Sequence, residues 1–270
     1  MRLSEAARLL GEAGIDSPRE EARRLFSHFG NIPLHSLIAC DCESDAPQLL
    51  HAIERRCARE PLQYIIGEVA FYRERYEVSP DCLIPREDTE VLVDYAVGRL
   101  REGARILDLC CGSGCIAISC VANTVGTSAV AADISAAALD IARRNISHNN
   151  VGGRVELLRL DVLREMPDTG EKFDAILSNP PYIADSVYLT LEREIFHEPR
   201  CAFVGGDDGG DFYRAITPRY KSLLAEGGFI AYEIGYDQSE LIRSVAADCD
   251  MSVEIICDLS GNPRVAVLEP

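Results

Sequence analysis

The chain has 270 residues, of which 47% are hydrophobic and 26% charged, a composition typical of a soluble globular protein rather than a disordered or collagen-like one. Its apolar runs are shorter than the ~18 residues that a membrane-spanning helix needs, and Glu5 and Glu12 interrupt the apolar positions near the start, so we expect neither a membrane span nor a signal peptide. The formal net charge is −17, and residues 73–270 carry −14 of it, which argues against a nucleic acid substrate and favours a basic protein surface or a cation as partner.

Residues 1–60 are predicted to form a small helical bundle. Apolar residues recur at helical spacing from Leu3 to Leu10, and Ser17-Pro18 is typical of the start of a second helix. Two further helices are expected over 33–38 and 48–59. The region holds no chemical motif, so it is either a packing cap on the larger domain, which the sequence slightly favours, or a docking surface for a macromolecular partner.

Residues 61–88 are predicted to be a linker with a β-hairpin, because apolar and polar residues alternate on both sides of a polar turn. Thr89 or Asp88 is then expected to cap a helix that runs to Leu100. Arg86 could face a ligand, although a charge pair near the helix start is the commoner explanation.

From Ala104 onward strands and helices alternate, which predicts a doubly wound, mainly parallel sheet. Strands are expected at 105–109, 128–132, 154–158, 173–177, 228–233, 252–257 and 264–268, and helices at 115–122, 136–145, 212–224 and 238–245.

Three consecutive strands are expected to end in residues that suit a nucleoside. Gly112 and Gly114 stand at a strand-to-helix turn, where glycine lets the backbone approach a ligand and the helix start offers free N–H groups. Asp133 ends the next strand, where a carboxylate can accept both ribose hydroxyls, and Asp161 ends the third, near an adenine amino group. The glycines and Ala117 also satisfy the spacing of dinucleotide enzymes, so NAD and S-adenosylmethionine (SAM) both remain candidates at this point.

The fourth strand is followed by Ser178-Asn179-Pro180-Pro181-Tyr182. Prolines cannot continue a strand, because they lack the N–H group and fix φ near about −65°. The chain must therefore turn rigidly, which leaves the Asn179 amide and the Pro180 carbonyl as fixed hydrogen-bonding groups beside Tyr182. Such a turn suits a planar –NH2 group, and a dehydrogenase has no use for it, which favours SAM. The sulfonium of SAM is also compatible with acidic surroundings at Asp108 and Glu233.

The 11 cysteines are scattered along the chain and show neither paired C-x-x-C spacing nor a zinc-type cluster with the five histidines. Their odd number, without a secretory signal, predicts reduced thiols in a cytoplasmic protein. We therefore expect no metal site.

These motifs resemble a known family. Asp108 with Gly112-Ser113-Gly114 is similar to the first motif of class I SAM-dependent methyltransferases, and Asn179-Pro180-Pro181-Tyr182 resembles the motif of those that methylate planar nitrogens. Further stretches are similar to release factor glutamine methyltransferases of the PrmC/HemK family, namely 61–67, 83–90, 198–200, 205–209, 213–214, 233–235, 238 and 261–265. The departures from that family's usual pattern are Cys110-Cys111 for Gly-Thr, Glu87-Asp88 for Pro-Glu, and Gly210 for Leu.

The resemblance implies a Rossmann-like, mainly parallel seven-stranded sheet with an N-terminal helical bundle. Its implied domains are residues 1–60 for substrate docking, 61–88 as linker and 89–270 as the SAM-dependent methyltransferase. The implied reaction moves a methyl group from SAM to the side-chain amide nitrogen (N5) of the glutamine in the Gly-Gly-Gln motif of class 1 peptide chain release factors. A cytoplasmic monomer that binds neither membrane nor, directly, nucleic acid is expected.

The resemblance also implies the site residues. The catalytic residues would be Asn179, Pro180 and Tyr182, which together with Pro181 would bind the substrate. The cofactor-binding residues would be Cys110, Cys111, Gly112, Ser113, Gly114, Asp133, Asp161, Val162, Asn179, Phe71 and Arg86. Phe71 and Arg86 are about equally compatible with plain core and surface roles. The alternatives are an adenine-N6 or cytosine-N4 nucleic acid methyltransferase, which the acidic charge disfavours, and a non-catalytic SAM-binding adaptor.

Overall fold

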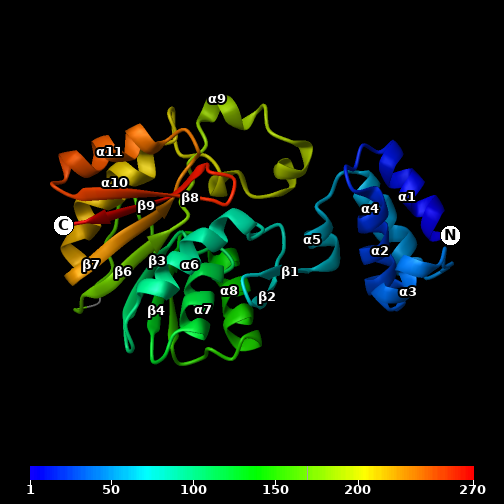
Figure 1. Cartoon of the computed structure of the whole chain (residues 1–270), viewed down its shortest axis with the longest axis horizontal. Coiled ribbons are helices and arrows are strands. Elements are labelled where there is room, and N and C mark those ends of the chain that lie inside the picture. The colour runs from blue at the N-terminus through cyan, green and yellow to red at the C-terminus, as the bar shows by residue number, and fades with distance from the viewer. Residues whose placement is uncertain (169) are drawn as a thin grey trace. The chain divides into compact units, whose positions relative to one another are not determined.

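The structure is a computed structural model that describes residues 1–168 and 170–270. The chain divides into two compact units. The first comprises Met1–Glu68 with Glu192–His197, and the second comprises Val69–Leu191 with Glu198–Pro270. Figure 1 shows the elements of each unit. In the described part of the chain no helix is both long and apolar enough to cross a membrane.

The first unit is helical. Its helices are α1 (Leu3–Glu12), α2 (Pro18–Phe29), α3 (Leu34–Ala39), α4 (Pro47–Cys57) and α5 (Leu62–Ile66). They pack around a small core in which Leu10, Leu25 and Phe26 are fully buried. Arg56 of α4 forms ion pairs with Glu21 at 2.5 Å and with Glu194 at 3.2 Å. Glu194 belongs to the short 3-10 helix η2 (Arg193–His197), so this pair explains why that segment clusters with the helical unit.

A two-stranded sheet of β1 (Glu68–Phe71) and β2 (Glu74–Glu77) follows the helices. The region expected to carry the hairpin begins instead with helix α5. Gly67 ends that helix because its φ of +87° is favoured by glycine, and its N–H group donates to the Gln63 carbonyl at 2.7 Å. The hairpin is therefore confined to residues 68–77.

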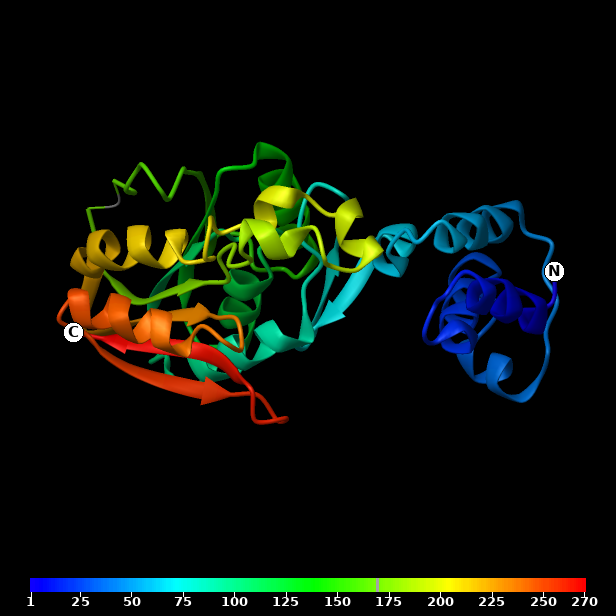
Figure 2. The same cartoon turned by 90° about the horizontal axis from the view of Figure 1, so that it is seen from above.

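The second unit is built on a seven-stranded sheet, as the sequence predicted. Its strands are β3 (Arg105–Leu109), β4 (Ser128–Asp133), β5 (Val155–Arg159), β6 (Phe173–Ser178), β7 (Leu224–Glu233), β8 (Ser252–Cys257) and β9 (Pro263–Glu269). They lie in the order β5-β4-β3-β6-β7-β9-β8. The first five strands of this order pair in parallel, and β9 is antiparallel to both neighbours. Figure 2 shows β8 and β9 running side by side in opposite directions.

Helices cover both faces of this sheet. The helices α6 (Glu90–Arg99), α7 (Cys115–Asn123) and α8 (Ala136–His148) pack on one face, and α10 (Asp211–Tyr220) and α11 (Ser239–Asp248) on the other (Figure 1). Successive strand residues alternate between the two cores: Ile106 of β3 packs with the first set of helices and Leu107 with the second. Burial of each such side chain stabilises the fold by about 1.5–3 kcal/mol.

The predicted boundary between α10 and β7 was wrong. The expected helix to residue 224 ends at Tyr220, two residues after Pro218 inside the helix, and the 3-10 turn η4 (Lys221–Leu223) follows. Strand β7 begins at Leu224 rather than at 228, because its pairing with β6 continues across a register shift near Phe173. The remaining short elements are η1 (Glu87–Thr89), α9 (Asp185–Tyr188) and η3 (Arg200–Ala202).

Candidate active site

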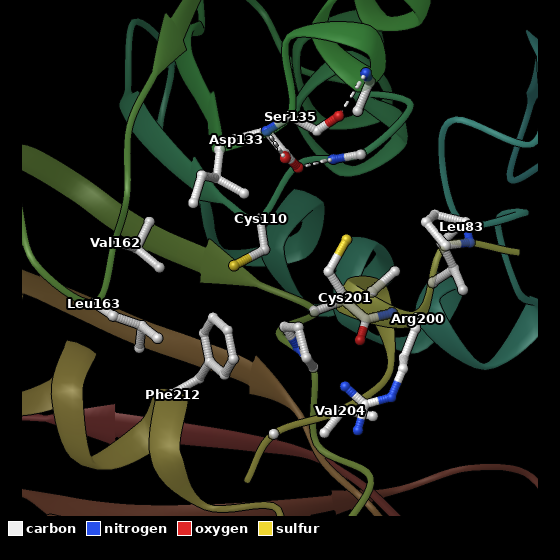
Figure 3. Close-up of a pocket in the computed structure, with 18 of the residues that line it drawn as sticks. Leu83, Cys110, Asp133, Ser135, Val162, Leu163, Arg200, Cys201, Val204 and Phe212 are labelled. Carbon is white, nitrogen blue, oxygen red and sulfur yellow. Dashed lines mark hydrogen bonds between the residues drawn. The ribbon is translucent and has the colours of Figure 1, made fainter. Parts of the chain in front are cut away.

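A cavity of about 370 Å³ lies beyond the carboxyl ends of β3, β4, β5 and β6. Strand β3 has β4 on one side and β6 on the other, so the cavity opens where the order of connections reverses, the usual ligand site of such sheets. Figure 3 shows Val162, Leu163 and Phe212 on one side of it and Cys201 on the other. Of the predicted site residues, the lining includes Cys110, Gly112, Asp133, Asp161, Val162, Asn179 and Pro181.

The turn after β3 brings the backbone to the cavity. Cys110 and Gly112 both have positive φ, +60° and +53°. A Cβ atom on Gly112 would meet nothing within 4 Å, so space is open in front of this backbone. A Cβ atom on Gly114 would lie 3.2 Å from Ile118 and 3.3 Å from Ala142, so this glycine allows α7 and α8 to pack closely. Gly112 thus borders the cavity while Gly114 serves the packing behind it.

Cys111 and Ser113 are buried, and with Gly114 they are not part of the lining that the described residues form. The Cys111 N–H group donates to the Ala132 carbonyl at 3.0 Å. The Ser113 carbonyl accepts from Asn145 Nδ2 at 2.9 Å, and both residues are buried. These contacts hold the turn in shape, so any contact of these three residues with a cofactor stays a prediction.

The side-chain carboxylate of Asp133, the last residue of β4, accepts hydrogen bonds from two backbone N–H groups. Its Oδ2 accepts from the Gly112 N–H group at 2.9 Å and its Oδ1 from the Ser135 N–H group at 2.9 Å (Figure 3). Burial raises the pKa of this carboxyl above its usual range. The side chain of Ser135, not Asp133, caps α8 by accepting from the Ala138 N–H group. Each carboxylate oxygen of Asp133 retains a lone pair for a further donor.

Asp161 lies one strand further along the same edge. Its Oδ1 accepts from the Leu163 N–H group at 3.1 Å, which shapes the loop that carries Val162 and Leu163 into the cavity. Arg164 lies 3.5 Å from its Oδ2. The side chain keeps acceptor capacity toward the cavity while its local contacts set the loop.

Asn179 stands at the opposite border and belongs to a chain of side-chain hydrogen bonds. Its Nδ2 donates to Thr89 Oγ1 at 3.1 Å, and that hydroxyl donates to Glu233 Oε2 at 2.5 Å. The Tyr182 hydroxyl donates to the other oxygen of the same carboxylate at 3.1 Å. Burial raises the pKa of Glu233 to about 7 and keeps the pKa of Tyr182 well above its usual range.

The Asn-Pro-Pro-Tyr turn rests on glycines from a distant loop. A Cβ atom on Gly205 would lie 2.4 Å from the Pro181 carbonyl oxygen, and one on Gly209 would lie 2.1 Å from the Tyr182 carbonyl oxygen. The latter carbonyl also accepts from Gln238 Nε2 at 2.9 Å. Pro180 is buried within this support. Neither Pro180 nor Tyr182 is among the described residues that line the cavity, so their catalytic roles stay predictions.

Phe71 and Arg86 lie outside the part of the cavity lining that the structure describes. Phe71 is 2% exposed, and its ring centroid lies 5.8 Å from that of Tyr76 in the core. Arg86 is paired with Glu198, whose other oxygen accepts from the Ile84 N–H group at 2.9 Å. The geometry lends no support to the predicted cofactor contacts of either residue.

The described cavity lining is acidic, with Asp81, Asp133, Asp161 and Asp211, but it does not include the two carboxyls that the sequence suggested for a sulfonium. Asp108 and Glu233 are 0% and 1% exposed, and both are absent from the described lining. Asp108 Oδ2 accepts from the Ala117 N–H group at 3.0 Å, and burial raises the pKa of this carboxyl to about 8. Both carboxyls are buried, and their contact with a sulfonium stays a prediction.

Sequence reasoning missed part of the wall of the cavity. Leu83, Cys201, Val204 and Phe212 line it without belonging to any motif that carries chemistry (Figure 3). Thr89 was expected only as a helix cap. The signal that could have found it is the stretch 83–90, which resembles the family except at Glu87-Asp88.

Comparison with known proteins agrees with this geometry. The family model of the PrmC N-terminal domain matches residues 2–67, and that of the methyltransferase small domain matches residues 88–207. The release factor glutamine methyltransferase of Moorella thermoacetica is 37% identical over 270 residues, which cover 97% of this chain and 95% of that protein. The one of Caulobacter vibrioides is 35% identical, with 96% and 91% covered.

Solved structures share the fold. The hMettl16 catalytic domain in complex with an RNA hairpin aligns with a TM-score of 0.57 at 12% identity, over 72% of this chain and 74% of that one. The precorrin-6y C5,15-methyltransferase of Geobacter metallireducens aligns with a TM-score of 0.50 at 15% identity, over 74% and 92%. With the full-length relatives, the predicted family is confirmed: the chain belongs to the release factor glutamine methyltransferases, a family of class I SAM-dependent methyltransferases.

Proposed function

We propose that the protein transfers a methyl group from SAM to the side-chain amide nitrogen of the glutamine in the Gly-Gly-Gln motif of class 1 release factors. The observation that carries the proposal is the position of Asn179 at the border of the cavity, with its Nδ2 already bound to Thr89. Its Oδ1 is therefore the atom left to accept from a substrate –NH2 group. Membership of the family supplies the substrate class.

The cavity fits SAM. Open space in front of Gly112 lets a ligand approach the backbone, and Asp133 retains acceptor capacity for ribose hydroxyls. Asp161, which lines the cavity together with Leu160 and Leu163, is the proposed acceptor of the adenine amino group. When bound, SAM supplies the methyl group as an electrophilic carbon on a sulfonium.

The task of the protein side chains is to present the nitrogen. An amide nitrogen is a weak nucleophile because its lone pair is delocalised into the carbonyl group. Asn179 Oδ1 and the Pro180 carbonyl would accept its two N–H groups and so aim the lone pair at the methyl carbon. Tyr182 would pack against the plane of the amide and Pro181 would keep the turn rigid. The turn needs no strong base before transfer.

The charge of the chain supports a protein substrate. Residues 73–270 carry −14, which repels the phosphate backbone of DNA or RNA and attracts a basic protein surface. We expect the helical unit to provide a second contact with the release factor and the enzyme to act as a monomer. The same acidity makes a nucleic acid methyltransferase the weaker alternative.

Incubation with labelled SAM and a release factor tests the proposal. We expect label in the wild-type factor and none after Gln→Ala in its Gly-Gly-Gln motif, with the mass of that peptide raised by one methyl group. Label that survives the substitution would contradict the substrate. Transfer to duplex DNA that weakens steeply with salt would favour the nucleic acid alternative, and SAM binding without any transfer would favour a non-catalytic adaptor.

A further inference from the structure

We infer that Thr89 and Glu233 are positioning residues: together they determine which atom of the Asn179 side-chain amide faces the substrate. The inference rests on the proposed function for its chemical meaning. The hydrogen bonds that carry it are a property of the fold itself and can be tested separately.

The first step concerns the hydroxyl group of Thr89. This residue occupies the N-cap position of α6, where a threonine side chain commonly accepts from a backbone N–H group of the first turn. Within the described chain its hydroxyl makes no such bond. It is 2% exposed and instead bridges Asn179 and Glu233, which are 90 and 144 positions away in the sequence. The Thr89 hydroxyl therefore bonds to residues of the site instead of capping α6.

The second step concerns the direction of the hydrogen bonds. A hydroxyl has one proton to donate. While Glu233 is ionised it can only accept, so Thr89 must give its proton to the carboxylate and can only accept from Asn179. The Asn179 amide must then present Nδ2 to Thr89 and Oδ1 to the other side. A buried carboxylate thereby determines the orientation of an amide that it does not touch.

The third step is that the same carboxylate orients a second residue of the turn. Its Oε1 accepts from the Tyr182 hydroxyl at 3.1 Å while its Oε2 accepts from Thr89. Glu233 is 1% exposed, so both bonds are shielded from water. The Glu233 carboxylate at the end of β7 therefore fixes Tyr182 directly and Asn179 through Thr89.

The test compares Thr89→Val, which keeps the shape and removes the hydroxyl, with Thr89→Ser, which keeps the hydroxyl. Thr217→Val is the matched control, because Thr217 is also fully buried and, among the residues that the structure describes, its hydroxyl is bonded to Tyr232 at 3.0 Å rather than to the site. We expect Thr89→Val to lower kcat with a release factor about tenfold, as loss of one buried hydrogen bond predicts, while leaving SAM affinity unchanged. Thr89→Ser should restore kcat, and Thr217→Val should not lower it.

A second readout needs no methyl transfer. In protein labelled with 15N-asparagine, the side-chain amide signals of Asn179, assigned by their loss in Asn179→Asp, should shift in Thr89→Val and in Glu233→Gln. A glutamine at 233 can donate as well as accept, so it no longer sets the direction. The same signals should keep their wild-type positions in Thr217→Val.

The two proposals fail separately. Unchanged Asn179 signals in Thr89→Val, or a kcat loss that Thr89→Ser does not repair, would overturn the positioning role even in an enzyme that methylates release factors. A wild-type protein that methylates no release factor would overturn the proposed substrate, while the NMR signals would still decide whether Thr89 and Glu233 orient the amide.

Discussion

The two borders of the cavity are built differently. On the side of β4 and β5, Asp133 and Asp161 are held by backbone N–H groups, most of them two positions along the chain. On the side of β6, Asn179 is held by Thr89, 90 positions away, and Tyr182 by Glu233, 51 positions away. Thr89 and Glu233, which are 144 positions apart, are themselves hydrogen-bonded. The hydrogen bonds of the predicted cofactor side therefore span at most 21 positions of the chain, whereas those of the predicted substrate side join β6, β7 and the start of α6.

Among variants that test this difference between the borders, Asn179→Ala is expected to have the largest effect on kcat. The substitution removes the proposed acceptor for the substrate amide, so kcat should fall about 10²–10³-fold, the range seen when one preorganised catalytic hydrogen-bonding group is lost. SAM affinity, measured by calorimetry, should change less than about twofold.

Asn123→Ala is a control for that experiment, because Asn123 Nδ2 also bonds to other side-chain and backbone groups, Glu74 Oε1 and the Ser119 carbonyl, but does not line the described cavity. Equal losses of kcat and SAM affinity in Asn179→Ala would mean that Asn179 serves mainly the cofactor, and the functional difference between the two borders would disappear.

Asp133→Ala should give the opposite pattern. It removes the acceptor of the Gly112 and Ser135 N–H groups and the proposed ribose contact, so the Kd for SAM should rise about 10- to 100-fold, as expected for hydrogen bonds to a charged group. At saturating SAM, kcat should change much less. Asp140→Ala, which removes an exposed carboxylate of α8 paired with Arg143, should bind SAM normally.

This difference between the borders also explains what the sequence could predict. The order of Gly112, Asp133 and Asp161 is visible because each follows its own strand, and the parallel sheet brings strand ends together. The bridge from Thr89 to Glu233 is invisible to local rules, which assign a threonine before a helix to capping. Phe71 is buried with its ring packed near Tyr76, which agrees with the core role that the sequence also allowed, and its cofactor contact stays a prediction.

Comparison of Gly209→Ala with a control should show how much unfolding free energy is lost to a steric clash with the turn and how much to a strained backbone. Gly209 has φ +78°, and a Cβ atom would lie 2.1 Å from the Tyr182 carbonyl oxygen. Gly153→Ala is the matched control, because Gly153 has φ +84° but open space around its Cβ position. The control should lose about 1–2 kcal/mol of unfolding free energy from the left-handed backbone alone.

Urea unfolding should show a larger loss for Gly209→Ala, about 3 kcal/mol or more, because an atom clash is added to the same backbone cost. Its kcat should fall as well, since the turn that carries Asn179 must move. Equal stabilities of the two variants would show that the loop does not press on the turn.

The smallest expected effect is a pH dependence from Glu233. Its pKa is raised from 4.5 to about 7 by burial, against the lowering effects of Thr89, Tyr182 and Arg264, while Asp88 adds a minor raising effect. The Tyr213 hydroxyl faces the same residue and donates to its backbone carbonyl. Because this pKa is raised in the folded state, the contribution of Glu233 to the free energy of unfolding is fully present below pH 4.5. It is lost as the pH rises through 7, at about 1.4 kcal/mol per pH unit.

Orientation of Asn179 requires the opposite state, because only the ionised carboxylate forces Thr89 to donate toward it. We therefore expect kcat to rise with pH up to about 7 while unfolding free energy falls over the same interval. In Glu233→Gln both slopes should flatten near pH 7, leaving the similar stability slope of Asp108, whose pKa is about 8. A wild-type kcat that stays constant between pH 6 and 8 would show that the charge of Glu233 does not control the orientation of Asn179.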